Sequence, residues 1–380
     1  MTTEFESASE NRALKQAIIE RIQRDGPISF RDYMEMVLYQ PALGYYTSER
    51  EKMGREGDYL TSPEVSPLFG AMMGRQLREM WEVLGRPASF DAIEVGAGNG
   101  TLARDILSWS KRTAPELAGA MRYSIVEISE ALVSRQRARL EAEGLASAVE
   151  WRSELPEGWT GCIFANELLD AMPTHRVRAE RGELREVIVT WDGNRFGEEL
   201  AEPNAEVSAY FERLGIQPGE GCYAEVNVAT PRWMTQVASG TDRGFLMLFD
   251  YGYEAPELYA SWRKDGTLLC FYKHNPSADP YARIGRQDMT AHVDFTTVRR
   301  SGEAAGLRTL GFVTQSEFLA NLGIGEALAP PKGGELEEHF RKRRAVMDLL
   351  DPGGLGRIKV LVQGRGVDGV PLRGFASVEV

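Results

Sequence analysis

Apolar residues in the first part of the chain recur with the period of helices. Between residues 11 and 24 every fourth side chain is apolar, which is typical of one buried helix face: Leu14, Ile18 and Ile22. A similar pattern covers residues 30–38, which Ser29 precedes as a possible cap. Another covers residues 67–84, which Ser66 precedes as a possible cap and which Pro67 begins. These patterns predict a helical N-terminal extension, residues 1–86, which we expect to form a lid.

After Pro87 the pattern changes to short apolar segments that alternate with helical ones. The segments predict strands at residues 90–95, 123–127, 149–151, 162–165, 245–250, 307–313 and 358–363. Helices are predicted between them, at residues 101–113 and 130–143. This order predicts an α/β fold with a mostly parallel, seven-stranded sheet covered by helices, whose last two strands form an antiparallel edge. We assign residues 87–174 and 240–380 to this core.

About 80 residues separate the fourth predicted strand from the fifth, too many for an ordinary connection. Apolar stretches around Val177, residues 184–189 and Phe196 are separated by Arg181-Gly182 and by Asp192-Gly193-Asn194. Glycine and asparagine at these reversals are typical of hairpin turns. We therefore predict an antiparallel, β-rich insertion at residues 175–239 that recognises a substrate.

Composition restricts the partners of the protein. The 380 residues include 56 acidic and 44 basic ones, a net charge of −12, which disfavours nucleic acid and anionic membrane surfaces. No apolar stretch reaches the roughly 18 residues of a membrane span, and the N-terminus lacks a leader pattern. Three widely spaced cysteines and four histidines lack metal-ligand spacing. We expect a cytoplasmic protein without a metal.

A glycine-rich turn, residues 94–101, lies between the first predicted strand and its helix. Its three glycines, at positions 96, 98 and 100, allow positive φ and close approach of a ligand. The next strand ends at Glu127, where a carboxylate is placed to bind the hydroxyls of a ribose. A dinucleotide fingerprint would have its third glycine at position 101, where this sequence has Thr101. S-adenosylmethionine is therefore favoured over NAD.

Polar residues also follow the fourth predicted strand, at Asn166, Glu167 and Asp170. In open α/β sheets ligands bind beyond the carboxyl ends of the strands. Two carboxylates three residues apart would share one side of a helical turn and could hold a guanidinium or ammonium group. An alternative is that Asn166 and Asp170 only cap the loop.

Several of these segments together resemble the MidA-type family of S-adenosylmethionine-dependent methyltransferases. The resemblance rests on motifs in chain order from about residue 27 to 364: Asp58 to Ser66, Gly96 to Gly100, Asn166 to Pro173, Asp250 to Gly252 and Gln287 to Phe295. It implies a class I, Rossmann-like methyltransferase fold. Eukaryotic members of this family are mitochondrial and dimethylate an arginine of a respiratory complex I subunit during its assembly.

The resemblance also implies roles for individual residues. The glycine turn would form the cofactor loop, Glu127 would bind the ribose, and residues 57–64 would fold over the methionine end. The implied cofactor-binding set is Thr61, Ser62, Pro63, Glu64, Glu94, Gly96, Gly98, Gly100, Thr101, Glu127 and Asn166. Glu167 and Asp170 would line the acceptor pocket.

The sequence departs from the family pattern on the acceptor side. Leu168-Leu169 replaces paired aromatic residues, and Tyr253 stands where histidine is usual. In the glycine turn, Ala97 and Asn99 replace proline and arginine. The cofactor assignment survives these changes, whereas the acceptor does not transfer directly.

The leading hypothesis is protein arginine N-methylation, with Glu167 and Asp170 orienting the guanidinium. A small-molecule O- or N-methyltransferase is the alternative, in which His274 or His292 would be the base. His292 could instead belong to a structural turn with Asp294, before the helix from Phe295. An assembly factor that needs no turnover, an NAD-dependent oxidoreductase and a homodimer also remain open.

Overall fold

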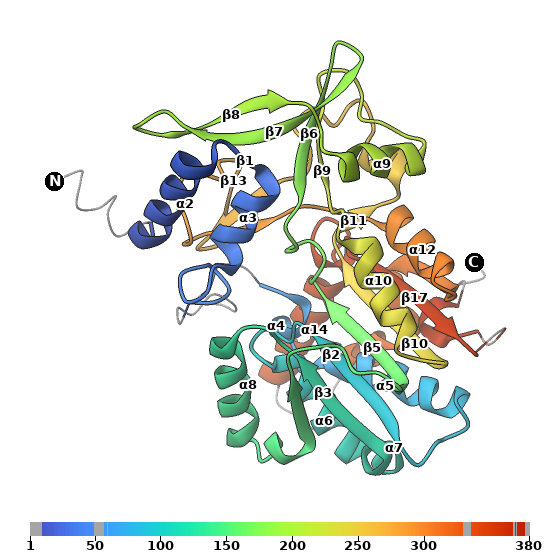
Figure 1. Ribbon diagram of the computed structural model, residues 1–380. Helices are drawn as coiled ribbons and strands as arrows, with labels where there is room; N and C mark the ends of the chain where they lie inside the picture. The colour runs from blue at the N-terminus through green and yellow to red at the C-terminus, as the bar shows by residue number, and fades with distance from the viewer. Residues whose placement is uncertain are drawn as a thin grey trace. The chain divides into compact units, whose positions relative to one another are not determined.

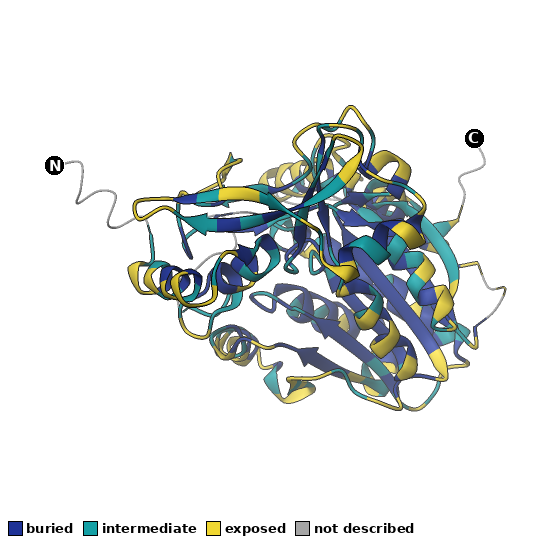
Figure 2. Ribbon diagram, turned by 45° about the horizontal axis from the view of Figure 1, so that its top comes forward, coloured by how far each residue is buried: buried dark blue, intermediate teal, exposed yellow. Residues whose placement is uncertain are grey.

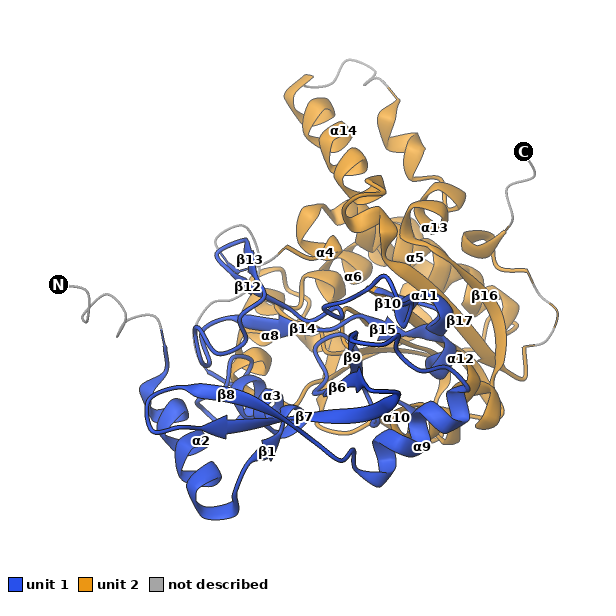
Figure 3. Cartoon of the chain, turned by 90° about the horizontal axis from the view of Figure 1, so that it is seen from above, with its two compact units in different colours: residues 1–59, 169–231, 252–298 blue, residues 60–168, 232–251, 299–380 orange. Residues whose placement is uncertain are grey.

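The computed structural model describes residues 10–48, 57–58, 60–329, 336–367, 369 and 371–376. Its chain forms two compact units, drawn in different colours in Figure 3. Unit 1 combines residues 1–59, 169–231 and 252–298, and unit 2 combines residues 60–168, 232–251 and 299–380. Each unit is therefore assembled from segments that are far apart in the sequence.

Unit 2 is built on a seven-stranded sheet with the strand order β16-β17-β10-β5-β2-β3-β4. The strands are β2 (Phe90–Val95), β3 (Met121–Val126), β4 (Val149–Arg152), β5 (Thr160–Asn166), β10 (Arg243–Asp250), β16 (Arg308–Thr314) and β17 (Lys359–Arg365). From β4 to β10 all neighbours are parallel, while β17 runs antiparallel to both β10 and β16. The predicted mostly parallel sheet with an antiparallel edge is confirmed.

The order of the strands reverses between β2 and β5. From β2 the chain proceeds outward to β3 and β4, and then returns to β5 on the other side of β2 before continuing to β10. Ligands of open α/β sheets bind at such a switch point, beyond the carboxyl ends of the strands. The topology thus places the ends of β2, β3 and β5 at the expected ligand edge.

Two helices of unit 2 pack closely on each other beside this sheet: α5 (Pro67–Val83) and α6 (Thr101–Thr113). A Cβ added to Gly74 of α5 would lie 2.3 Å from the ring of Trp109 in α6, so only glycine permits this spacing. The apolar face of α5, including Phe69, Met73 and Leu77, is buried in the core with β2 and β10. Figure 2 shows the central strands of this sheet mostly in dark blue, the colour of buried residues.

Unit 1 contains an antiparallel sheet in the order β1-β7-β6-β9, with β8 paired to the other side of β7. Its strands are β1 (Ile28–Ser29), β6 (His175–Glu180), β7 (Glu183–Trp191), β8 (Phe196–Ala201) and β9 (Tyr223–Val226). The predicted meander corresponds to β6, β7 and β8 (Figure 1). In β6 buried residues alternate with less buried ones, the pattern of a strand with one face against a core.

The first helices of the chain share a core with this antiparallel sheet. They are α2 (Arg12–Asp25) and α3 (Phe30–Tyr39), and β1 between them pairs with β7. Tyr33 of α3 is fully buried with Val189 of β7 and Phe196 of β8. The compact units therefore differ from the predicted boundaries: residues 1–86 are divided after position 59, because α2 and α3 bury their apolar faces with the insertion.

The remaining elements connect these layers. Further helices are α4 (Ser62–Val65), α7 (Pro115–Ala120), α8 (Glu130–Ala142), α9 (Ala205–Leu214), α10 (Thr230–Ser239), α11 (Ala255–Leu258), α12 (Phe295–Ala304), α13 (Gln315–Asn321) and α14 (Leu336–Leu350). Short 3-10 turns are η1 (Ala146–Ala148), η2 (Ile324–Leu328), η3 (Leu355–Arg357) and η4 (Arg373–Phe375). Short strands of unit 1 are β11 (Gly252–Tyr253), β12 (Leu269–Tyr272), β13 (Asn275–Ser277), β14 (Asp288–Thr290) and β15 (Val293–Asp294). Among the described residues, no helix is both long and apolar enough to cross a bilayer.

Candidate active site

The glycine turn follows β2 and leads into α6, as the sequence predicted. Gly96, Gly98 and Gly100 have φ values of 70°, 53° and 76°, a region that residues with a Cβ rarely occupy. Gly100 lies at the N-cap position of α6, so the turn directs backbone N–H groups of the helix start toward the ligand edge. The three glycines are therefore required by the backbone itself.

A buried glutamine joins this turn to the predicted ribose ligand. Gln136 of α8 is fully buried, and its Nε2 donates to the carbonyl oxygen of Gly98 at 2.9 Å and to Glu127 Oε2 at 3.2 Å. Its Oε1 accepts a hydrogen bond from Trp151 Nε1 at 3.1 Å, and Glu127 Oε1 accepts one from the backbone of Ser129 at 3.0 Å. This network fixes the carboxylate beside the glycine turn.

Sequence reasoning missed Gln136, although the helix pattern carries a signal for it. The buried residues of α8 are Leu132, Gln136 and Leu140, so a polar side chain stands in the middle of the apolar stripe. A buried amide needs hydrogen-bond partners, and a polar residue at such a position therefore indicates a specific network.

An exposed apolar residue follows the predicted ribose ligand directly. Ile128 lies at the end of β3 and is 68% exposed. Apolar side chains this exposed are favourable places for a flat apolar ligand surface to pack, because the contact removes the side chain from water. Ile128 is a second residue that the sequence reasoning did not select.

Glu94, at the end of β2, is buried and already has a partner. Its Oε2 accepts a hydrogen bond from the hydroxyl of Tyr123 at 2.6 Å. Burial raises the pKa of this carboxyl from 4.5 to about 7, the Tyr123 hydrogen bond opposes the shift, and the charge of Glu127 adds to it. Glu94 therefore changes its charge near neutral pH.

This shift predicts a pH-dependent stability. Between its unfolded pKa of 4.5 and its folded pKa of about 7, the folded protein holds the Glu94 proton and the unfolded chain releases it, so stability falls as the pH rises. Replacing the carboxyl in Glu94→Gln should remove this loss, roughly 2–3 kcal/mol of unfolding free energy between pH 5 and pH 8. Urea unfolding of the cofactor-free protein and the variant at both pH values measures the difference. The prediction would be contradicted if the unfolding free energies of the wild type and of Glu94→Gln changed equally between the two pH values.

The segment predicted to cover the cofactor is tied to the start of α6. Glu64 of α4 accepts a hydrogen bond from the Thr101 hydroxyl at 2.5 Å, and Arg139 of α8 donates to the same hydroxyl oxygen. Arg139 also lies 3.8 Å from the Glu64 carboxylate. On the same segment, Ser62 donates to Gln315 at 2.9 Å. Glu64 and Thr101 thus contact each other, which holds residues 61–65 against the glycine turn.

Asn166 and Glu167 lie at the end of β5, next to the switch point. Asn166 Nδ2 donates to Glu167 Oε1 at 3.0 Å, whereas the buried Asn166 Oδ1 has no hydrogen-bond partner among the described residues. Glu167 has a φ of 52°, an uncommon conformation for a residue with a side chain, and its N–H donates to the carbonyl of Phe249 at 2.8 Å. A strained acidic residue beside an unpaired acceptor is typical of a ligand site.

The predicted helical turn after Glu167 is wrong. Residues 167–172 form bends and a turn, because the positive φ of Glu167 ends the strand abruptly. Asp170 belongs to unit 1, where it is 5% exposed and its backbone carbonyl accepts a hydrogen bond from Ala291 at 2.9 Å. The structure therefore brings Asp170 beside the segment of His292, within unit 1.

His292 contacts neighbouring residues of unit 1. Its backbone N–H donates to the hydroxyl of Thr267 at 3.0 Å, and the centroid of its ring lies 5.4 Å from that of the Tyr253 ring. The nearby Asp294 caps α12, accepting from the N–H of Thr296 at 2.9 Å. A cavity lined by His292 and Asp294 measures about 20 Å³, room for a single water. These contacts favour the structural alternative for this histidine, and its catalytic role stays a prediction.

No cluster of three or more metal-ligating side chains was found within the described ranges. The three cysteines are free and buried. Among the predicted site residues, the structure gathers the ones on the cofactor side in unit 2.

Two kinds of comparison connect this geometry with known sequences. Residues 72–313 match a family model described as "Putative S-adenosyl-L-methionine-dependent methyltransferase". A Drosophila melanogaster mitochondrial protein, named a protein arginine methyltransferase NDUFAF7 homolog, is 30% identical over 96% of this chain and 89% of its own. The human mitochondrial protein arginine methyltransferase NDUFAF7 is 28% identical over 80% of this chain and 72% of its own.

A solved structure supports the fold over nearly the whole length. A Burkholderia thailandensis protein crystallised with S-adenosyl-homocysteine superposes with a TM-score of 0.89 at 34% identity. The superposition covers 96% of this chain and 95% of that protein. The predicted class I methyltransferase fold and the predicted cofactor are both confirmed.

The predicted cytoplasmic location is wrong, because the curated relatives are mitochondrial proteins. The prediction rested on the widely spaced cysteines, which indicate only a reducing compartment, and on the lack of a recognisable leader pattern. Since the family model spans well over half of the chain, the protein belongs to this family of S-adenosylmethionine-dependent methyltransferases.

Proposed function

We propose that the protein transfers methyl groups from S-adenosylmethionine to an arginine nitrogen of a partner protein. The observation that carries the proposal is the acidic side chain at the end of β5, Glu167, which Asn166 Nδ2 holds at 3.0 Å in the same unit as the glycine turn and the fixed Glu127 carboxylate. The names of the relatives, which are protein arginine methyltransferases, support the same acceptor.

The residues around the glycine turn and the end of β5 fit S-adenosylmethionine. Glu127 would accept hydrogen bonds from the ribose hydroxyls, and the exposed side chain of Ile128 would pack on the adenine. The unpaired Asn166 Oδ1 offers an acceptor to the amino group of the methionine end. The glycine turn leaves space for the backbone to approach. When bound, the cofactor supplies an electrophilic methyl group on a sulfonium.

In this proposal Glu167 binds and orients the guanidinium of the acceptor. A carboxylate can accept two parallel hydrogen bonds from a guanidinium, which fixes the plane of the group. Fixing the plane aims one nitrogen along the axis of displacement, and alignment of this kind supplies much of the acceleration of a transfer reaction. The proton of that nitrogen leaves to Glu167 or to solvent as the reaction proceeds.

The network around Gln136 gives a prediction for cofactor binding. Gln136→Met keeps the volume but leaves the carbonyl of Gly98 and Trp151 Nε1 without their partner. Affinity for S-adenosylhomocysteine, measured by calorimetry, should fall by about tenfold or more, because a buried network loses its central group. Gln236→Met, an exposed glutamine of α10, is the matched control and should bind normally. Normal binding by Gln136→Met would refute the positioning role.

Label transfer tests the proposed acceptor class. The protein is incubated with cell extract and S-adenosylmethionine labelled in its methyl group, and macromolecules are then separated from small molecules. We expect label in the protein fraction. Label confined to small molecules would overturn the proposal in favour of small-molecule methylation.

A further inference from the structure

Helix α14 carries an apolar stripe on the face that points away from its core. Leu336, Phe340 and Met347 are 68%, 60% and 64% exposed, whereas Ala345, Val346 and Leu349 of the same helix are buried. The exposed residues are spaced by four and seven positions, the spacing of a helix face that packs on another helix. Figure 3 shows α14 at the margin of unit 2.

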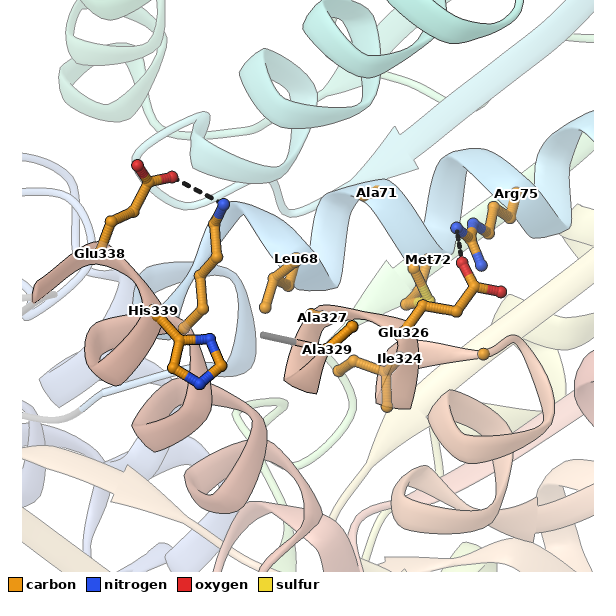
Figure 4. Close-up of a pocket in the computed structure, with 12 residues that line it drawn as sticks. Leu68, Ala71, Met72, Arg75, Ile324, Glu326, Ala327, Ala329, Glu338 and His339 are labelled. Carbon is orange, nitrogen blue, oxygen red and sulfur yellow. Dashed lines mark hydrogen bonds and ion pairs between the residues drawn. The ribbon is translucent and has the colours of Figure 1, made fainter. Parts of the chain in front are cut away.

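The stripe is separate from the cavity on the other side of this helix. That cavity measures about 410 Å³, and Leu68 and Met72 of α5 form part of its wall (Figure 4). Its charged groups are satisfied by each other, since Lys342 lies 2.6 Å from Glu338, and Arg75 lies 2.7 Å from Glu326. These four charged groups of the cavity wall are therefore paired within the protein, while the three side chains of the stripe are exposed.

The charges along α14 indicate what covers the stripe. Glu337 stands beside Leu336 near the start of the helix, and Arg343 and Arg344 stand between Phe340 and Met347. Acidic residues stand at the start of the helix and basic residues follow them, of which Arg344 also lies 3.9 Å from Asp348. The acidic start and the basic middle are complementary to those of an antiparallel copy of the helix. An isologous contact of this kind forms each favourable pair twice.

We propose that α14 pairs antiparallel with α14 of a second copy of the chain. In the register that matches the apolar residues, Leu336 packs on Met347 of the second copy and Phe340 lies against Arg343 of the second copy. Glu337 then lies beside Arg344 of the second copy, in the flanking position that carries salt bridges in coiled coils. Phenylalanine against a guanidinium is a favourable cation–π pair.

The contact is small, and this sets the strength of the expected dimer. A helix of 15 residues is about 22 Å long, so one helix pair buries less than the roughly 1,200 Å² of a standard interface. We expect a reversible dimer that forms at concentrations on the order of micromolar. The proposal is independent of the acceptor and of methyl transfer.

Sedimentation velocity of the purified full chain over a range of concentrations tests the proposal. Wild type should shift from monomer to dimer as its concentration rises, and Phe340→Glu should weaken dimerisation by roughly tenfold or more. Trp262→Glu is the matched control, since Trp262 is 66% exposed in unit 1, and it should behave as wild type. Thermal unfolding of each variant shows that it is folded.

A charge-reversal cycle identifies the face and the register. Glu337→Arg and Arg344→Glu should each weaken the dimer, and the double variant should restore it, because the pair is re-formed with reversed signs. Wild type that stays monomeric throughout would overturn the proposal. So would a dimer that Phe340→Glu leaves intact, or a double variant that fails to recover.

Discussion

Glu167→Gln is expected to lower the rate of methyl transfer at least about a hundredfold while S-adenosylhomocysteine binds normally. The substitution keeps the size of the side chain and removes its charge, so the guanidinium loses the carboxylate that orients it and that can accept its proton. Asn166 Nδ2 can still donate to the side-chain oxygen, which preserves the local hydrogen bond of 3.0 Å. The loss should therefore appear in turnover and not in cofactor affinity.

The measurement is incorporation of labelled methyl groups into extract proteins, alongside calorimetry with S-adenosylhomocysteine. Glu199→Gln, at an exposed position of β8, controls for the removal of a carboxylate and should transfer normally. Full activity of Glu167→Gln would eliminate the proposed role of this residue. Loss of cofactor binding would instead place Glu167 in the cofactor site.

Glu127→Ala is expected to weaken cofactor binding by roughly 1–3 kcal/mol, about five- to 150-fold. The Glu127 carboxylate is held by the N–H of Ser129 and by Gln136, so it is oriented before the ligand arrives. A pre-oriented, charged acceptor loses little entropy on binding two hydroxyls, and its removal sacrifices both hydrogen bonds.

Calorimetry with S-adenosylhomocysteine measures the Glu127→Ala effect. Ser129→Ala is a useful control, because it removes the side-chain cap of α8 and leaves the Glu127 carboxylate in place. A loss of affinity in Ser129→Ala equal to that in Glu127→Ala would attribute the effect to α8 rather than to the ribose. Unchanged affinity in Glu127→Ala would refute the ribose contact.

Much of the cofactor side could be predicted from the sequence because it depends on local rules. Strands buried on both faces have short runs of apolar residues. A glycine-rich turn between such a strand and a helix is typical of a ligand-binding loop. The three glycines with positive φ, the capping serines and Glu127 at a strand end all follow from these rules.

The features that the sequence did not predict depend on contacts between distant segments. Helices α2 and α3 looked like part of one N-terminal extension, but their apolar faces pack with β7 and β8, about 150 residues later. No periodicity shows which sheet an amphipathic helix will join. Glu167, whose positive φ stands where a helical turn was predicted, likewise donates its N–H to Phe249 of a strand about 80 residues later, a contact that the local pattern does not show.

The identity of the methylated residue tests the central claim most directly. Extract proteins labelled by the wild-type protein are digested and analysed by mass spectrometry, with Glu167→Gln as the inactive reference. We expect a methylated arginine that is absent from the reference. Methyl groups found only on lysine, on an oxygen atom or on small molecules would contradict the proposed arginine transfer.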